Sequence, residues 1–222
     1  MSRLSPNVAL NAEMLLQKAA AQTSLSDFGD DSFREPFTIL LQSLRDEARL
    51  NTQGVILMQR TMLRLLANRL RTEAAFAAHP EMAETPIERP LYILGFPRTG
   101  TTLLHNLLAC DPAARWLRLW EGLHPAPPPE SLEDDSRIAQ TEEFVAGFEK
   151  IAPRLVIAHK LNATGPEECL WLIEHTFADF IFELRANIPN YSKWLTGHEA
   201  DAVWYRYYRR QLQMLGWKCR GS

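Results

Sequence analysis

Residues 97–102, with the sequence Pro-Arg-Thr-Gly-Thr-Thr, contain the residue types that bind a phosphate or a sulfate group. Arg98 offers a planar fork of N–H donors that fits an oxyanion, and Thr101 and Thr102 add hydroxyl groups. Leucines at helical spacing follow at once, so the free N–H groups at the start of that helix would face the same anion. The stretch therefore predicts an anion-binding loop.

The glycines around this loop indicate which anion it binds. Gly95 and Gly100 have the spacing of the glycine frame in a nucleotide-binding P-loop, but Thr101 stands where that motif has its lysine. In enzymes that use ATP or GTP this lysine contacts the β- and γ-phosphates, so its absence argues against a nucleoside triphosphate as substrate. One cation, two hydroxyls and several amides instead suit a single 5′-phosphate that carries a small second anion.

Two side chains are predicted to accept a proton. Glu121 ends a stretch with the alternation of a strand, and the carboxyl ends of parallel strands form the reactive edge of an open sheet. The alternative is that Glu121 is an exposed loop carboxylate. His159 follows the short apolar run 155–158, where a histidine can act as a proton acceptor, and we rank it second to Glu121.

Other titratable residues have simpler structural explanations. His105 is expected at the edge of the helix that follows the loop, and the arginines of the predicted helix 51–78 on its solvated face. Glu167 and Glu168 are expected in the first turn of a helix that begins at Pro166. Carboxylates there stabilise the helix dipole, so capping is their default role.

The elements around the loop predict an α/β fold. Residues 91–94 form a short apolar run typical of a strand, residues 100–110 a helix, residues 115–120 a second strand, and residues 155–158 a strand or a buried turn. We therefore predict a P-loop-like parallel sheet flanked by helices, which so few strands would leave incomplete within this chain.

The first 89 residues predict helices. Apolar residues at helical spacing predict one amphipathic helix over residues 32–50 and a longer one over residues 51–78, capped by Asn51. We expect a helical N-terminal extension, residues 1–89, followed by the N-terminal part of a P-loop-like domain, residues 90–222.

The loop resembles the 5′-phosphosulfate loop of the sulfotransferases, enzymes that use 3′-phosphoadenosine 5′-phosphosulfate (PAPS). The resemblance begins at about Asp31 and reaches the last residue. Further short motifs resemble the bacterial-type branch of that family: Asp111-Pro112, Trp120-Glu121, Pro127-Pro128-Pro129 and Gly165-Pro166-Glu167-Glu168-Cys169.

This resemblance implies transfer of a sulfuryl group from PAPS to the hydroxyl group of an alcohol or phenol. Arg98 would stabilise the charge that develops on the leaving oxygen. Glu121, or failing it His159, would take the proton of the acceptor. No metal is expected, because the transferred group carries less charge than a phosphoryl group. The residues that would bind the donor are Arg98, Thr99, Gly100, Thr101 and Thr102.

One part of the family pattern has no counterpart here. Sulfotransferases bind the 3′-phosphate of PAPS through an Arg and a Ser well after the first loop, and related bacterial proteins have an Arg-Asp-Pro segment in that region. Only five residues follow Trp217. We expect this sequence to be the front portion of a longer protein or a truncated gene product, with the 3′-phosphate site beyond Ser222, so these residues alone need not be active.

Composition indicates the class of protein and its cellular compartment. The 222 residues are 46% hydrophobic and 23% charged, as in an ordinary globular protein, and the net charge of −3 does not indicate a nucleic-acid partner. Three cysteines without a C-x-x-C pair favour a reducing compartment. No export signal or apolar run of ~18 residues is present. We expect a cytoplasmic protein with a small-molecule hydroxyl acceptor and no membrane partner, in an oligomeric state that the sequence does not predict.

Two alternatives remain open. One is a P-loop kinase or NTPase, which the missing lysine disfavours. The other is a helical interaction protein without catalytic activity that retains a vestigial nucleotide loop.

Overall fold

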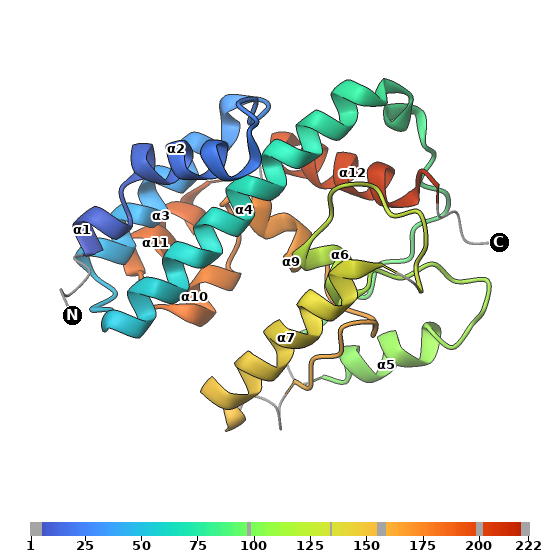
Figure 1. Cartoon of the computed structure of the whole chain (residues 1–222). Helices are drawn as coiled ribbons and strands as arrows, with labels where there is room; N and C mark the ends of the chain where they lie inside the picture. Colours follow the sequence, from blue (N-terminus) through green and yellow to red (C-terminus); the bar gives the residue numbers. More distant parts are fainter. Residues whose placement is uncertain (1–5, 97–98, 134, 155–158, 199–201, 219–222) are drawn as a thin grey trace. The chain divides into compact units, whose positions relative to one another are not determined.

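The computed structural model describes residues 6–96, 99–133, 135–154, 159–198 and 202–218 (Figure 1). The chain divides into two compact units. Unit 1 comprises Met1–His79 and Leu172–Arg210, and unit 2 comprises Pro80–Trp171 and Gln211–Ser222.

Unit 1 is built from helices whose ends follow local capping rules. Asn51 caps the long helix α4 by accepting a hydrogen bond from the N–H of Gly54, 2.8 Å away, so the predicted start of this helix is confirmed. Asn11 caps α2 in the same way through Met14. The helices are α1 (Pro6–Ala9), α2 (Ala12–Thr23), α3 (Arg34–Asp46), α4 (Thr52–Ala78), α10 (Ile181–Arg185), α11 (Pro189–Gly197) and α12 (Ala202–Gly216), of which the last continues into unit 2.

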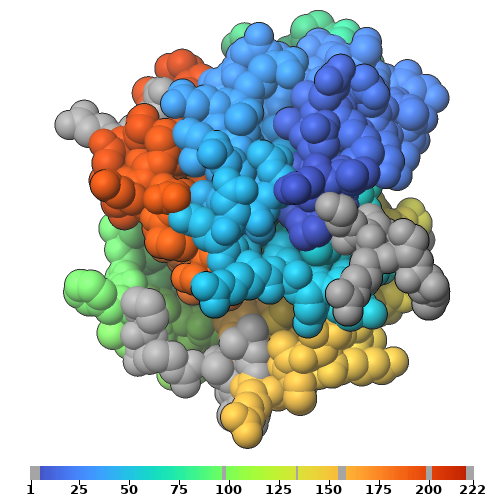
Figure 2. All heavy atoms as spheres, turned by 90° about the vertical axis from the view of Figure 1, so that its left-hand side faces the viewer, coloured from blue at the N-terminus to red at the C-terminus, as the bar shows by residue number. Residues whose placement is uncertain are grey.

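Segments far apart in the sequence pack together in this unit. Helix α3 contacts α11, and Figure 2 shows the light-blue α3 region beside the orange residues that include α11. Arg69 of α4 is 1% exposed, and its guanidinium lies between the rings of Phe33 and Tyr207, 4.2 and 4.1 Å from their centroids. The prediction that the α4 arginines are solvated is therefore wrong for Arg69, because aromatic faces and backbone carbonyls replace water around it.

Unit 2 contains shorter helices joined by irregular segments. They are η2 (Pro80–Glu84), α5 (Thr101–Leu108), α6 (Leu119–Leu123), α7 (Ser136–Ile151) and α9 (Leu170–Ile173), of which α9 ends in unit 1. None of the helices in the described residues is long and apolar enough to span a bilayer.

The predicted parallel sheet is wrong. The described residues contain no strand, and their one isolated bridge pairs Arg118 with Pro166 in antiparallel fashion. Of the predicted second strand, residues 115–117 have no regular structure and Arg118 forms this bridge, because α6 already begins at Leu119. The predicted run 155–158 lies outside the described residues.

The reason why no sheet forms is clearest at residues 91–94, which the sequence predicts to be a strand. Residues 91–94 have the right composition, but no described segment pairs with them in a hydrogen-bonded ladder, and a strand is not stable without such a partner. Leu94 and Phe96 are 89% and 83% exposed. The fold that these described residues form is therefore helical and irregular, not α/β.

Candidate active site

The described residues on either side of 97–98 lie close together in unit 2. A Cβ atom at Gly95 would lie 2.8 Å from Thr101 Cγ2 and 2.9 Å from Thr99 Oγ1, so any larger residue there would require these two threonine side chains to move. The hydroxyl of Thr99 donates to the carbonyl of Phe96 at 2.7 Å, which closes the turn. Arg98 lies outside the described residues, so its predicted role stays a prediction.

Thr99 and Gly100 lead directly into helix α5. Gly100 has a φ of +94°, in the left-handed region that favours glycine, and it precedes the first helical residue without a side-chain cap. The first N–H groups of α5, at Thr101 and Thr102, therefore have no side-chain acceptor at the cap position. Such N–H groups, with the positive end of the helix dipole, form a site suited to an anion.

Glu121 is neither at a strand end nor in an exposed loop. It lies in the first turn of α6 with 0% exposure, and its carboxylate accepts the backbone N–H of Arg118 at 2.9 Å. The guanidinium of Arg115 binds both carboxylate oxygens, with Nη1 3.0 Å from Oε2. This bidentate pair fixes the carboxylate of Glu121 in the interior.

His159 is paired with a carboxylate that the sequence did not single out for chemistry. Its Nε2 lies 3.0 Å from Oε1 of Glu167, and its side chain remains 34% exposed. The hydrogen bond to Glu167 raises the pKa of His159 above its ordinary value, against the opposing effect of burial. Glu167 and Glu168 precede α9, so the expected helix-capping role of these residues is wrong.

The two candidate proton acceptors lie on segments that the structure joins. The N–H of Glu167 donates to the carbonyl of Leu117 at 2.9 Å, and the N–H of Trp120 donates to the carbonyl of Ala163 at 3.0 Å. By contrast, the hydrogen bonds that Thr99 makes among the described residues stay within the loop. The structure thus brings together Glu121, Glu167 and His159, but shows no direct bond between them and the loop in the part of the chain that it describes.

The sulfotransferase family model matches residues 90–213, more than half of the chain. The chain belongs to the sulfotransferase family. The family predicted from the sequence is thereby confirmed, and the match covers the loop, Glu121 and the His159–Glu167 pair.

Solved structures agree with this family assignment. Sulfotransferase STF1 from Mycobacterium tuberculosis H37Rv is 30% identical, with a TM-score of 0.80 over 93% of this chain and 57% of its own. Sulfotransferase STF9 from Mycobacterium avium is also 30% identical, with a TM-score of 0.82 over 96% of this chain and 55% of its own. The present chain thus spans little more than half the length of these sulfotransferases. No curated protein sequence matches it.

In this sulfotransferase-family chain, the described groups whose pKa values depart most from their ordinary values lie in unit 1. Glu174 is fully buried between Arg64 and Arg185, and these two cations hold its pKa at about 2 despite burial. Burial lowers the pKa of His175 to about 3, so its ring is neutral, and its Nε2 lies 2.9 Å from Nδ2 of Asn68. Every charge here has a partner inside the unit, which indicates a structural role.

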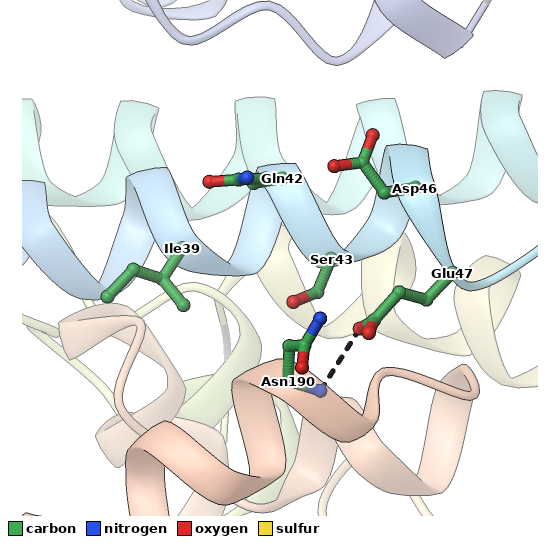
Figure 3. A pocket seen from close by; sticks show the side chains of 6 residues that line it. All are labelled: Ile39, Gln42, Ser43, Asp46, Glu47 and Asn190. Carbon is green, nitrogen blue, oxygen red and sulfur yellow. Dashed lines mark hydrogen bonds between the residues drawn. The ribbon is translucent and has the colours of Figure 1, made fainter.

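A pocket of about 230 Å³ in unit 1 lies between α3 and α11 (Figure 3). Two acidic residues, Asp46 and Glu47, line it, and Glu47 already accepts the N–H of Asn190 at 3.1 Å in the first turn of α11. None of the predicted site residues lines this pocket, so it provides no link to the predicted chemistry. Among the described residues, no group of three or more His, Cys, Asp or Glu side chains is arranged to hold a metal ion.

Proposed function

We propose that this chain carries the donor-binding part of an enzyme that transfers the sulfuryl group of PAPS to the hydroxyl group of a small molecule. One observation carries the proposal. Helix α5 begins after Gly100 without a side-chain cap, and it lies within the stretch that the sulfotransferase family model matches. In this proposal residues 90–222 belong to the catalytic domain and residues 1–89 form a helical extension.

The loop binds the 5′ end of the donor. The N–H groups that begin α5, the backbone of Thr99 and the hydroxyls of Thr101 and Thr102 surround the 5′-phosphosulfate, with the backbone of Gly100 allowing close approach. Arg98 supplies the positive charge that a P-loop lysine would supply elsewhere. These donors stabilise the charge that develops on the leaving 5′-phosphate oxygen.

His159 accepts the proton of the acceptor. The acceptor oxygen forms a bond to sulfur while the bond from sulfur to the 5′-phosphate oxygen breaks, so that 3′-phosphoadenosine 5′-phosphate leaves. The hydroxyl proton moves to the imidazole and then to solvent. The geometry favours His159 over Glu121, which reverses the order expected from the sequence, because Arg115 and the N–H of Arg118 already occupy the carboxylate of Glu121.

The proposal also includes a cytoplasmic location. Among the described residues Cys110 is exposed and forms no disulfide, as in proteins of reducing compartments. Fractionation of the source cells, followed by detection of the protein, tests this location directly.

Calorimetric titration with 3′-phosphoadenosine 5′-phosphate and, separately, with ATP and Mg²⁺ tests the function. We expect the first ligand alone to bind, and Arg98→Ala to weaken its binding at least tenfold, while Arg154→Ala, at an exposed position, leaves the affinity unchanged. Binding of ATP alone would support a kinase or NTPase instead. Binding of neither ligand, both by this chain and by a longer protein that includes the 3′-phosphate site expected beyond Ser222, would favour the non-catalytic interaction protein.

A further inference from the structure

We infer that Glu167 is a positioning residue that fixes the ring of His159, so that the Nδ1 of His159 is the atom that accepts a proton. The inference builds on the proposed function, but its first test needs no activity. It assigns a chemical role to a carboxylate that sequence patterning placed at a helix cap.

The carboxylate of Glu167 is held from several sides. The residue is 5% exposed, and its Oε2 accepts the indole N–H of Trp171 at 3.1 Å and the backbone N–H of Glu168 at 3.2 Å. Its own N–H is bonded to the carbonyl of Leu117, which fixes the backbone. Two donors thus fix one oxygen, and the other oxygen, Oε1, is directed to His159.

This arrangement determines which nitrogen of His159 carries the proton. A carboxylate can only accept, so Nε2 must be the N–H donor to Oε1, and in the neutral ring the lone pair then lies on Nδ1. When Nδ1 takes a proton, the buried negative charge of Glu167 stabilises the imidazolium that forms. The raised pKa of His159 has this same cause, and the neighbouring carboxylate of Glu168 contributes in the same direction.

The partners of Glu167 also show which substitution separates positioning from folding. Trp171 is 8% exposed and packs against Gly122, where an added Cβ would lie 2.6 Å from the Cβ of Trp171, so loss of the whole Glu167 side chain would disturb this packing. Glu167→Gln keeps the volume and an oxygen for the indole N–H. Its amide group then faces Nε2 as a donor, which reverses the tautomer of His159.

The experiment is ¹⁵N NMR of the histidine rings in the wild-type chain, in Glu167→Gln and in the matched control Glu168→Gln. We expect the wild type and the control to show the Nε2–H tautomer, and Glu167→Gln to show Nδ1–H with a proton affinity at His159 lowered about tenfold. An unchanged tautomer and proton affinity in Glu167→Gln would overturn the inference. If that variant does not fold, the wild-type spectrum decides, since an Nδ1–H tautomer there contradicts the assignment.

A second readout separates this inference from the proposed function. We expect 3′-phosphoadenosine 5′-phosphate to bind wild type and Glu167→Gln equally, because Glu167 does not contribute to the loop. In an active sulfotransferase that contains this chain, kcat should fall about 100-fold in Glu167→Gln while the KM for PAPS stays the same. If the wild type does not bind the nucleotide, the proposed function is contradicted, but the result on the tautomer of His159 remains valid.

Discussion

Unit 2 contains two buried carboxylates on joined segments, and their partners differ. Glu121 is bound by the permanently charged guanidinium of Arg115, whereas Glu167 is bound by neutral N–H donors and by a histidine that can gain or lose a proton. Both residues are almost completely inaccessible to solvent. The comparison shows that burial alone does not mark a catalytic carboxylate, because the partner decides whether a proton can move.

The largest expected effect comes from breaking the pair around Glu121. Arg115→Ala leaves the buried carboxylate of Glu121 with the more distant guanidinium of Arg118, at 3.9 Å, as its cationic partner, which costs about 3 kcal/mol of the free energy of unfolding. Urea denaturation measures this loss, with Lys150→Ala at an exposed position as the control. A loss below about 1 kcal/mol would mean that the pair around Glu121 is not a structural support.

The next effect is on kcat, which should separate His159 from Glu121. His159→Asn should lower kcat about 100-fold in an active enzyme, equal to about 2.7 kcal/mol of barrier, and leave nucleotide affinity unchanged. Glu121→Gln should act mainly on stability. A larger loss of kcat in a folded Glu121→Gln enzyme than in His159→Asn would restore Glu121 as the proton acceptor.

A smaller effect is expected from one donor to Glu167. Trp171→Phe removes the indole N–H that bonds Oε2 but keeps an aromatic ring in place, so the free energy of unfolding should fall by about 1 kcal/mol. The tautomer of His159 should not change, since Oε1 still faces the ring. A reversed tautomer in Trp171→Phe would show that the indole, and not the carboxylate, orients the histidine.

The smallest effect is a pH dependence of stability. Because the folded state raises the pKa of His159, its pairing with Glu167 stabilises the fold fully below the unfolded value of about 6.5. This contribution, about 0.5 kcal/mol for a partly exposed pair, is lost as the pH rises through the folded pKa. The stability difference between wild type and Glu167→Gln should therefore shrink from pH 6 to pH 9. A difference that grows over this range would contradict the pairing.

Local patterns in the sequence predicted the parts of the structure that depend on near neighbours. Asn51 and the apolar spacing after it predicted α4, and the glycines before α5 predicted where that helix begins. The family followed from the same loop. These features depend on hydrogen bonds between residues only a few positions apart, so the sequence is sufficient to find them.

Features that depend on distant partners were missed or predicted wrongly. Residues 91–94 have the composition of a strand, but composition cannot supply the neighbouring strand that makes a sheet. The pair of His159 with Glu167 depends on a turn and on contact with Leu117, and the burial of Arg69 depends on aromatic rings from other segments. The spacing of Glu167 and Trp171, four residues apart, was a weak signal that the carboxylate has a partner.

The most direct test of the central proposal is to follow the backbone amides of Thr101, Thr102 and Leu103 by NMR while 3′-phosphoadenosine 5′-phosphate is added. If the start of α5 binds the 5′-phosphate, these resonances shift and saturate with the nucleotide but not with adenosine at the same concentration. Nucleotide binding that leaves them unmoved, or no binding at all, would contradict the account.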